Sequence, residues 1–365
     1  MTSDYSLSRL RRGLAEWFGR NARALPWRET TDPYHIWLSE VILQQTQVVQ
    51  GLGYYHRFLE AFPTIEDLAS ASEDEVLRLW QGLGYYSRGR NLRRAAQMVV
   101  SDFGGRMPQN IEEIKRLPGV GPYTQAAVLS FAYNLPYAAV DGNVYRVLSR
   151  LYAIDTPIDT TKGQREFRLL AQELLDPIEP GLHNQAMIEL GALCCTPRRP
   201  RCHECPLATF CLAREEGRQA ELPRKQGKVR VTSRYLNYLL VLLPEGQTLI
   251  RRRGEGDIWQ GLYELPLIET PKPVTAEQLL SHEDMQSLLE ELEQPQVQLQ
   301  PVATRKHRLT HRLLEASLTV VRAKGCSECL RGTYHTIALT SRASYGMPIL
   351  LDKLIATFQH QDKEQ

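Results

Sequence analysis

Residues 117–124 read Leu-Pro-Gly-Val-Gly-Pro-Tyr-Thr, a turn placed between two stretches of helical periodicity at 111–117 and 123–133. The glycines let the backbone come close to a ligand, and Pro122 suits the first turn of the second helix. The amides exposed at that helix N-terminus would attract a phosphate group. An ordinary tight turn between two helices has the same composition, so the string alone leaves both interpretations open.

The sequence around this turn is helical in character up to about residue 215. Amphipathic patterns separated by Gly, Pro and Asp predict helices at 8–18, 34–50, 73–79, 90–103, 111–117, 123–133, 143–151 and 164–175. The pentapeptide Gly-Leu-Gly-Tyr-Tyr occurs at 51–55 and at 82–86. Because the flanking residues differ, we interpret the two copies as similar loops at helix ends.

The character of the sequence changes after a polar, basic stretch at 221–230, whose Pro and Gly residues predict a linker. Beyond it, β-type runs occupy 235–243, 248–253, 297–302, 313–321 and 334–339, and 348–358 predicts a closing helix. We therefore expect an α+β two-domain protein. Its predicted parts are an all-α domain at 1–220, a linker at 221–232 and a smaller α+β domain at 233–365.

Composition sets broad limits. The 365 residues, 42% of them hydrophobic, are enough for two cores, and a net charge of +2 is too small to identify a nucleic-acid partner. Neither 1–10 nor any later segment has the apolar run of a signal peptide or a membrane helix. We therefore expect a soluble, cytoplasmic protein with no membrane association.

Cysteines crowd into one short segment. Five of the seven lie within 194–211, which suits metal ligation in a reducing compartment better than a disulfide framework. Four of them keep the spacing C-x6-C-x2-C-x5-C, namely Cys195, Cys202, Cys205 and Cys211. Four thiolates could hold one zinc ion, but zinc sites more often pair two C-x2-C knuckles, and this segment has one. The spacing therefore favours an iron–sulfur cluster.

The remaining cysteines do not extend this site. Cys194 breaks the spacing, and we expect a free buried thiol there. Cys326 and Cys329 form a distant C-x2-C pair that lacks two further ligands, so we expect them in a surface hairpin.

Three strings together resemble one family. The turn at 117–124 matches the helix-hairpin-helix signature, and the cysteine spacing is similar to the [4Fe–4S] loop of endonuclease III and MutY glycosylases. Residues 39–46, Ser-Glu-Val-Ile-Leu-Gln-Gln-Thr, match the MutY string Ser-Glu-Val-x-Leu-Gln-Gln-Thr. The chain thus resembles the MutY family of iron–sulfur adenine DNA glycosylases along nearly its whole length. The resemblance implies an all-α helix-hairpin-helix domain with a [4Fe–4S] loop, a MutT-like (Nudix-fold) second domain, and a place in the bacterial cytosol or nucleoid.

Two carboxylates fit the implied chemistry. Breaking a base–sugar bond needs a proton on the departing purine and stabilisation of an oxocarbenium-like sugar. By the resemblance, Glu40 protonates N7 of adenine, and Asp141 stabilises the sugar cation or its covalent successor before water attacks. Glu40 borders the apolar face of its helix, where burial would raise its pKa, although a solvated glutamate is the ordinary alternative. Asp141 precedes a helix, so it also suits capping, and a helix N-terminus favours the ionised form.

The hairpin also bears on strand cleavage. Bifunctional relatives such as endonuclease III carry a Schiff-base lysine where this chain has Tyr123. Without that amine, efficient β-elimination is not expected, so the resemblance implies a monofunctional glycosylase. Tyr123 also matches an active-site tyrosine of MutY enzymes, and Asn143 matches an asparagine that partners the catalytic aspartate. A packed tyrosine and a capping asparagine are the structural alternatives.

Other residues match positions that contact DNA. An enzyme acting on a base must extrude it and fill the gap, and Gln45 and Tyr85 match family positions that enter the stack beside the partner purine. Arg28 resembles the family arginine near the adenine pocket, and Gly119 and Gly121 would grip the DNA backbone without reading sequence. We interpret a basic run near the N-terminus as a solvated helix face without specific contacts, comprising Arg9, Arg11, Arg12, Arg20 and Arg23.

The second domain resembles MutT more loosely, through Ile-Trp-Gln-Gly-Leu-Tyr-Glu-Leu-Pro at 258–266. It lacks the R-E-x-x-E-E box that binds Mg²⁺, which argues against nucleotide hydrolysis. In the family a Phe-Ser-His loop contacts 8-oxoguanine, and its nearest match here is Leu309-Thr310-His311. Thr310 keeps a hydroxyl and His311 an imidazole, whereas Leu309 loses an aromatic contact. A strand boundary that does not touch DNA is the alternative.

The resemblance as a whole implies a monomer that removes adenine mispaired with 8-oxoguanine or guanine from double-stranded DNA, with a linker on which repair or replication proteins can dock. Two other functions stay open. An endonuclease III-like enzyme acting on oxidised pyrimidines is disfavoured by Tyr123 and by the added domain. A non-catalytic iron–sulfur DNA-binding or redox-sensing protein would leave Glu40 and Asp141 without a role.

Overall fold

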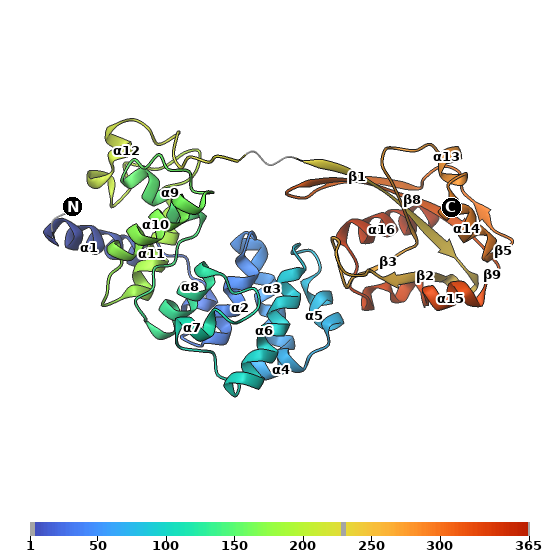
Figure 1. Ribbon diagram of the computed structural model, residues 1–365, viewed down its shortest axis with the longest axis horizontal. Coiled ribbons are helices and arrows are strands. Elements are labelled where there is room, and N and C mark those ends of the chain that lie inside the picture. The colour runs from blue at the N-terminus through green and yellow to red at the C-terminus, as the bar shows by residue number, and fades with distance from the viewer. Residues whose placement is uncertain (1–3, 228–230, 364–365) are drawn as a thin grey trace. The chain divides into compact units, whose positions relative to one another are not determined.

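The computed structural model describes residues 4–227 and 231–363, and the chain divides into two compact units. The first unit comprises Met1–Ser70 and Asn91–Lys228, and the second comprises Ala71–Arg90 and Val229–Gln365. The first is helical, and the second combines sheets with helices, which confirms the predicted fold class (Figure 1). Our predicted limits instead place 71–90 in the helical domain. Part of the predicted linker, 228–230, lies outside the described residues.

Helices build the first unit. They are α1 (Asp4–Asn21), η1 (Pro26–Arg28), α2 (Pro33–Leu43), α3 (Val48–Ala61), α4 (Ile65–Ser70), α6 (Ser87–Phe103), which starts in the range of the second unit, α7 (Ile111–Ile114), α8 (Pro122–Tyr133), α9 (Gly142–Leu151), α10 (Thr161–Leu174), α11 (Pro180–Leu193), η2 (Ala208–Phe210) and α12 (Leu212–Glu215). No helix in the described ranges is long and apolar enough to cross a membrane.

Helix α2 lies at the centre of this unit. Asp32 caps it by accepting hydrogen bonds from the amides of Tyr34 (2.8 Å) and His35 (3.4 Å). Eight of its eleven residues are buried, and Trp37 and Leu38 are fully shielded from solvent. Helix α8 packs along α2 and also contacts α11. A separate apolar core joins α1, α9, α10 and α11. These contacts fix the helices that carry the candidate active site.

The predicted helix at 34–50 is in fact two helices. It breaks after Leu43 because Gln45 adopts a left-handed backbone conformation, with φ of 58°, and α3 starts at Val48. The pentapeptide at 51–55 therefore lies inside α3, and its interpretation as a loop is wrong. A Cβ added at Gly51 would come within 2.8 Å of the tip of the Leu43 side chain, which would have to shift. The second copy, at 82–86, does form a loop.

The described residues of the second unit form three sheets and several helices. They are α5 (Glu73–Trp80), β1 (Thr232–Leu242), η3 (Pro244–Gly246), β2 (Gln247–Arg252), β3 (Tyr263–Glu264), β4 (Leu267–Thr270), α13 (Ala276–Leu280), α14 (Glu283–Glu290), β5 (Leu292–Glu293), β6 (Gln296–Val297), β7 (Ala303–Arg308), β8 (Arg312–Arg322), β9 (Gly325–Cys326), α15 (Glu328–Thr333), β10 (His335–Ala338), η4 (Leu339–Ser344) and α16 (Ile349–Lys363).

The largest sheet has the strand order β4-β1-β8-β6, and β7 also pairs with β8. Strands β1 and β8 run parallel, with Tyr238 opposite Leu318, and the other pairs in this sheet are antiparallel. Both faces of β1 are covered, because Tyr238 belongs to the core containing α16 residues while Leu239 belongs to the core containing α14 residues. A three-stranded antiparallel sheet, β10-β2-β3, and the β5-β9 pair complete the unit.

The strand predicted at 297–302 is largely wrong. Only Gln296–Val297 form β6, and β7 begins at Ala303. Pro301 has no amide hydrogen to donate to a sheet, which explains why a strand does not run through this segment.

Candidate active site

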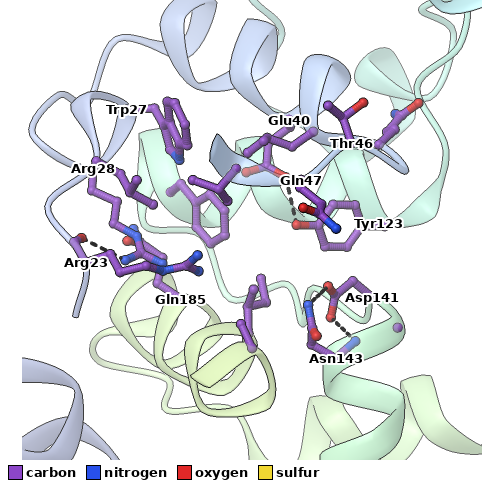
Figure 2. A pocket seen from close by; sticks show the side chains of 18 of the residues that line it. Arg23, Trp27, Arg28, Glu40, Thr46, Gln47, Tyr123, Asp141, Asn143 and Gln185 are labelled. Carbon is purple, nitrogen blue, oxygen red and sulfur yellow. Dashed lines mark hydrogen bonds between the residues drawn. The ribbon is translucent and has the colours of Figure 1, made fainter. Parts of the chain in front are cut away.

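A pocket of about 910 Å³ opens within the first unit. Its walls come from η1, α2, the segment joining α2 to α3, and the starts of α8 and α9, with α11 on the remaining side. Figure 2 shows Glu40, Tyr123, Asp141 and Asn143 on the pocket wall, together with Arg28 from η1. Residues that are about a hundred positions apart in the sequence thus line one pocket.

Glu40 lies in the middle of α2 and is buried, with 7% of its surface exposed. Burial raises the pKa of Glu40 to about 7, and the negative charge of Asp141 contributes to the increase. The Tyr123 hydroxyl opposes it by donating a hydrogen bond of 2.7 Å to Glu40 Oε2. Burial also raises the pKa of Tyr123 well above its ordinary value, so the phenol keeps its proton. Glu40 can therefore exchange a proton near neutral pH.

Asp141 is the N-cap of α9. Its carboxylate accepts hydrogen bonds from the amides of Asn143 (2.9 Å) and Val144 (2.8 Å) and from Asn143 Nδ2 (2.7 Å). We expected the helix N-terminus to favour the ionised form. Burial instead outweighs these hydrogen bonds and raises the pKa of Asp141 above its ordinary value. The capping role and the position in the pocket wall occur together.

A hydrogen-bonded chain continues from Asn143 to the cysteine loop. Arg146 donates to Asn143 Oδ1 over 2.8 Å and to the carbonyls of Gly191 (2.7 Å) and Cys195 (2.7 Å). Helix α11 passes close to Asn143, because a Cβ added at Gly191 would lie 2.6 Å from the Asn143 Cβ. The orientation of the Asp141 partner is therefore tied to the loop that begins at Cys195.

A buried ion cluster lies beside the pocket, and its two arginines, Arg23 and Arg28, line the pocket wall. Glu189 on α11 has no exposed side-chain surface and accepts hydrogen bonds from Arg28 (3.1 and 2.8 Å) and from the Arg23 side chain (2.8 and 2.6 Å). Burial alone would raise the pKa of Glu189, but these bonds prevail and lower it to about 2. The interpretation of Arg23 as a solvated residue without specific contacts is therefore wrong, and so is that of Arg11, which donates to the carbonyls of Leu174 and Leu175.

The two hairpin glycines, Gly119 and Gly121, have different surroundings. Gly119 has φ of 76°, and an added Cβ would meet the Asn91 Cβ at 2.8 Å. Gly121 is the N-cap of α8, makes no side-chain capping bond, and has no heavy atom within 4 Å of an added Cβ. The space beside Gly121 and the amides of the first turn are compatible with a phosphate at this position. Their role in DNA binding stays a prediction.

Both predicted stacking residues adopt left-handed backbone conformations. Gln45 has φ of 58° and is exposed at the pocket wall, and Tyr85 has φ of 47° with 46% of its surface exposed. Such conformations are uncommon outside glycine and cluster at functional sites. Gln45 belongs to the first unit and Tyr85 to the second.

The segment with Leu309, Thr310 and His311 forms the turn between β7 and β8, closed by a 2.8 Å hydrogen bond from the Leu309 amide to the Arg312 carbonyl. Thr310 and His311 are exposed there. Within the second unit, the hydroxyls of Tyr85 and Thr310 hydrogen-bond to each other. The structure thus brings together two predicted DNA-contacting residues that lie 225 positions apart.

The cysteine loop is organised around Arg150. This arginine is 2% exposed and donates to the carbonyls of Thr196 (2.7 Å) and Pro197 (3.0 Å) and to Cys195 Sγ (3.3 Å). One hollow is lined by the four predicted ligands together with Cys194, namely Cys194, Cys195, Cys202, Cys205 and Cys211. In the described ranges, no three His, Cys, Asp or Glu side chains converge closely enough to hold a single metal ion. Five cysteines and three arginines, Arg150, Arg201 and Arg214, line this hollow, and thiolates beside guanidinium groups fit an anionic iron–sulfur cluster.

The three remaining cysteines differ in burial. Cys194 is 1% exposed, with its Sγ 3.3 Å from the Arg201 carbonyl, as expected for a buried thiol. Cys326 is buried in β9 against the core beneath α14, so the prediction of a surface hairpin is wrong for it. Cys329 is exposed in α15.

Three family models match different parts of the chain. Residues 38–173 match the HhH-GPD superfamily of base excision DNA repair proteins, and 237–357 match the NUDIX domain. Residues 195–211 match the iron–sulfur binding domain of endonuclease III, and every cysteine in that range is one of the four predicted ligands. These matches support the helix-hairpin-helix domain, the Nudix fold and the iron–sulfur cofactor.

Curated relatives give a more specific family. An adenine DNA glycosylase of Buchnera aphidicola (subspecies Baizongia pistaciae) is 35% identical over 68% of this chain and 70% of its own length. The chain belongs to the adenine DNA glycosylase family. The human adenine DNA glycosylase is 46% identical over 58% of this chain and 40% of its own length. The chain therefore matches less than half of the human family member.

Two solved structures resemble part of this family member. A thermostable thymine-DNA glycosylase superposes with a TM-score of 0.53 and 29% identity, covering 57% of this chain and 97% of that protein. A trapped endonuclease III–DNA covalent intermediate gives a TM-score of 0.51 at 23% identity, covering 60% and 99% of the two chains. The second likeness shows the fold alone.

Sequence reasoning missed two features of the pocket. Glu189 lies in a helical pattern like any surface glutamate, and its burial could have been inferred only from the apolar residues at 186, 187 and 190 on its helix. Trp27 and Gln185 also line the pocket, although no local motif singles out either of them. These residues become recognisable only when η1 and α11 meet in the fold.

Proposed function

We propose that this chain is a monofunctional DNA glycosylase that removes adenine opposite 8-oxoguanine, or opposite guanine, from double-stranded DNA. The observation that carries the proposal is the buried Glu40 in a large pocket, with a pKa near 7 and with Asp141 in the same pocket wall. Membership of the adenine DNA glycosylase family supports the choice of adenine.

The proposed reaction begins with a proton. With its pKa raised to about 7, Glu40 can carry a proton near neutral pH, and transfer of that proton to N7 of an extruded adenine makes the base a better leaving group. The C1′–N9 bond then breaks, and its electron pair stays on the adenine. Asp141 stabilises the positive sugar, water adds its oxygen to C1′, and the water proton passes to a carboxylate.

The lack of an amine argues against strand cleavage. Tyr123 occupies the position of the Schiff-base lysine, and its hydroxyl is engaged with Glu40. None of the described residues that line the pocket is a lysine. Without an amine to attack C1′, the product is an abasic site in an intact strand.

The remaining parts hold the cofactor and the DNA. Cys195, Cys202, Cys205 and Cys211 are the proposed cluster ligands, and a bound cluster would cross-link the loop that Arg146 connects to Asn143. For DNA, Gln45 and Tyr85 would enter the stack, and Gly119 and Gly121 would hold a phosphate. Thr310 and His311 would contact the 8-oxoguanine edge, and the Arg28 ion cluster would form the pocket wall.

The test is a single-turnover incubation of the purified protein with a duplex that carries adenine opposite 8-oxoguanine. Samples are analysed with and without hot alkali, because an abasic site breaks only under alkali. Parallel duplexes carry thymine glycol, the substrate of the endonuclease III alternative, and thymine opposite guanine, which the similarity to a thymine-DNA glycosylase suggests.

We expect alkali-dependent cleavage of the adenine strand in the wild type and its loss in Glu40→Gln. Nicking of the thymine-glycol strand without alkali would contradict the proposal and favour an endonuclease III-like enzyme. Tight binding without cleavage of any duplex, unchanged in Glu40→Gln, would favour a non-catalytic DNA-binding protein.

A further inference from the structure

The loop at 82–86 holds three left-handed positions, at 82, 84 and 85. Gly82 and Gly84 have φ of 97° and 72°, and Tyr85 follows with 47°. Glycine adopts this conformation without cost, but a tyrosine does not, so surrounding contacts must hold it. The loop connects α5 to α6, and Tyr85 is one of the exposed large side chains of the protein.

Arg88, in the first turn of α6, contacts this loop. Its guanidinium donates hydrogen bonds of 3.2 Å to the carbonyls of Leu83 and Gly84. It also lies over the rings of Trp80 (5.1 Å) and Tyr85 (5.9 Å). Burial lowers the pKa of Arg88 to about 10, which leaves the side chain charged at neutral pH. The guanidinium therefore spans the peptide that leads into Tyr85.

Trp80 provides the rigid base. It is fully buried, and its Nε1 donates a 3.0 Å hydrogen bond to the same Gly84 carbonyl that Arg88 contacts. Gly89 packs flat against the indole, since an added Cβ would lie 3.1 to 3.3 Å from three of its ring atoms. One carbonyl is thus held by two donors, from the end of α5 and the start of α6.

The geometry points to Arg88 as the positioning residue of the Tyr85 wedge: with Trp80 it fixes the Gly84 carbonyl so that the tyrosine is already exposed in its left-handed conformation before DNA binds. This inference rests on the proposed function, in which Tyr85 enters the DNA stack. A loop that is ordered in advance avoids an entropic cost at binding. Loss of Arg88 would leave the chemistry at Glu40 intact and weaken the recognition of the mispair.

A direct contact between Arg88 and a DNA phosphate is the competing explanation, and salt dependence separates the two. Each lost phosphate contact reduces the slope of log affinity against log salt by about 0.9. A positioning residue leaves that slope unchanged. Arg94→Met is the matched control, because Arg94 is an exposed arginine on the same helix, α6.

The experiment is a double-mutant cycle on the full chain. The probe is a duplex with 2′-fluoro-2′-deoxyadenosine opposite 8-oxoguanine, whose fluorine disfavours the sugar cation and so prevents excision. Affinity is measured for the wild type, Arg88→Met, Tyr85→Ala and the double variant at several salt concentrations. Arg88→Lys is added because a lysine ammonium keeps the charge but lacks the planar guanidinium that lies over the Trp80 and Tyr85 rings.

We expect Tyr85→Ala to weaken binding about tenfold, as for loss of a stacked base, and Arg88→Met and Arg88→Lys to weaken it several-fold. In the Tyr85→Ala background, Arg88→Met should then change affinity less than about twofold, which is the signature of coupled residues. Trp80→Phe keeps a ring but loses the hydrogen-bond donor to the Gly84 carbonyl, so it should weaken binding as Arg88→Met does. It replaces the arginine variants in the test if they do not fold.

Additive losses, or a smaller salt slope in Arg88→Met, would overturn the positioning role while leaving the glycosylase proposal intact. If Tyr85→Ala binds as tightly as the wild type, the wedge and this inference both fail. Excision of adenine by the wild type tests the proposed function separately, so the two failures are distinguishable.

Discussion

The pocket around Glu40 and the two exposed segments with Tyr85 and Thr310 are built in opposite ways. In the pocket, Glu40 is buried and Asp141 is partly buried, and removal from water raises the pKa of both carboxyls. At the exposed segments the side chains are accessible, and order comes from the backbone, through the left-handed Tyr85 and the closed turn at Leu309. Proton transfer requires burial, whereas recognition of a duplex requires accessible groups in fixed positions.

The same contrast distinguishes the cations of the two regions. Arg28 and Arg23 surround the buried Glu189 and lower its pKa to about 2. Arg88 instead contacts neutral carbonyls of the 82–86 loop. Changes in the pocket should therefore affect catalysis and stability strongly, and changes at the exposed segments should affect selectivity by smaller factors.

The largest expected effect is that of Glu40→Gln on catalysis. Removal of a general acid lowers reaction rates by about 10²- to 10⁴-fold. The single-turnover rate of adenine excision should therefore fall by at least about 10²-fold. Binding of the 2′-fluoro duplex should persist. Loss of binding together with activity would show that Glu40 acts in substrate affinity instead.

The same substitution should stabilise the protein at high pH. A carboxyl whose folded pKa is raised from 4.5 to about 7 contributes stability that is fully present below about pH 4.5 and is lost as pH rises through 7. Glutamine stays uncharged. Above pH 7 the free energy of unfolding of the variant should therefore exceed that of the wild type by up to about 3 kcal/mol. Thermal unfolding at pH 5 and pH 8 checks this, since the gain should disappear at the lower pH.

The next largest effect is expected at Glu189. Glu189→Gln leaves Arg23 and Arg28 without their buried counter-charge. This should lower the free energy of unfolding by about 3 to 5 kcal/mol. The matched control is Asp102→Asn in the exposed Arg116–Asp102 pair, where the cost should stay below about 1 kcal/mol. Chemical denaturation followed by far-UV circular dichroism measures both, and equal shifts would contradict the assignment of a buried ion cluster.

An intermediate effect concerns the pH dependence of the excision rate. If protonated Glu40 is the acid, the single-turnover rate falls as pH rises through about 7. The Tyr123 hydrogen bond lowers the pKa of Glu40, so Tyr123→Phe should move this alkaline limb upward by roughly half to one pH unit. A shift in the opposite direction would mean that Tyr123 donates to another group during the reaction.

How much the sequence could predict differs between the two regions. Glu40, Tyr123 and Asp141 lie in strings specific enough to name them individually, and the fold places all three in one pocket wall. Glu189 could not be predicted, because its role depends on two arginines from a segment about 160 residues away. The pKa of Asp141 was expected to fall from capping alone, since burial of that carboxyl cannot be read from a single helix start.

Secondary structure shows the same limit. The break between α2 and α3 depends on a left-handed glutamine, a conformation that residue type does not indicate. The two copies of Gly-Leu-Gly-Tyr-Tyr differ in structure because Gly51 packs on Leu43 within a helix, whereas Gly84 lies in a turn at φ of 72°. Local composition predicts helices and strands well where the backbone conformation depends on local sequence. It predicts them less well where packing against a neighbouring element determines the conformation.

The smallest effect is expected at Thr310, and it tests whether the exposed segments determine selectivity. Thr310→Ala removes a hydroxyl whose hydrogen bond is worth about 0.5 to 1.5 kcal/mol, so affinity for 2′-fluoroadenine opposite 8-oxoguanine should fall about two- to tenfold. Affinity for the same base opposite guanine should change less, because the hydroxyl would bond to the modified edge. Thr310→Ser keeps the hydroxyl and should retain selectivity. Equal losses for both duplexes would instead assign the Thr310 hydroxyl to its hydrogen bond with Tyr85 or to the DNA backbone, and selectivity would then depend on Tyr85 and the rigidity of its loop.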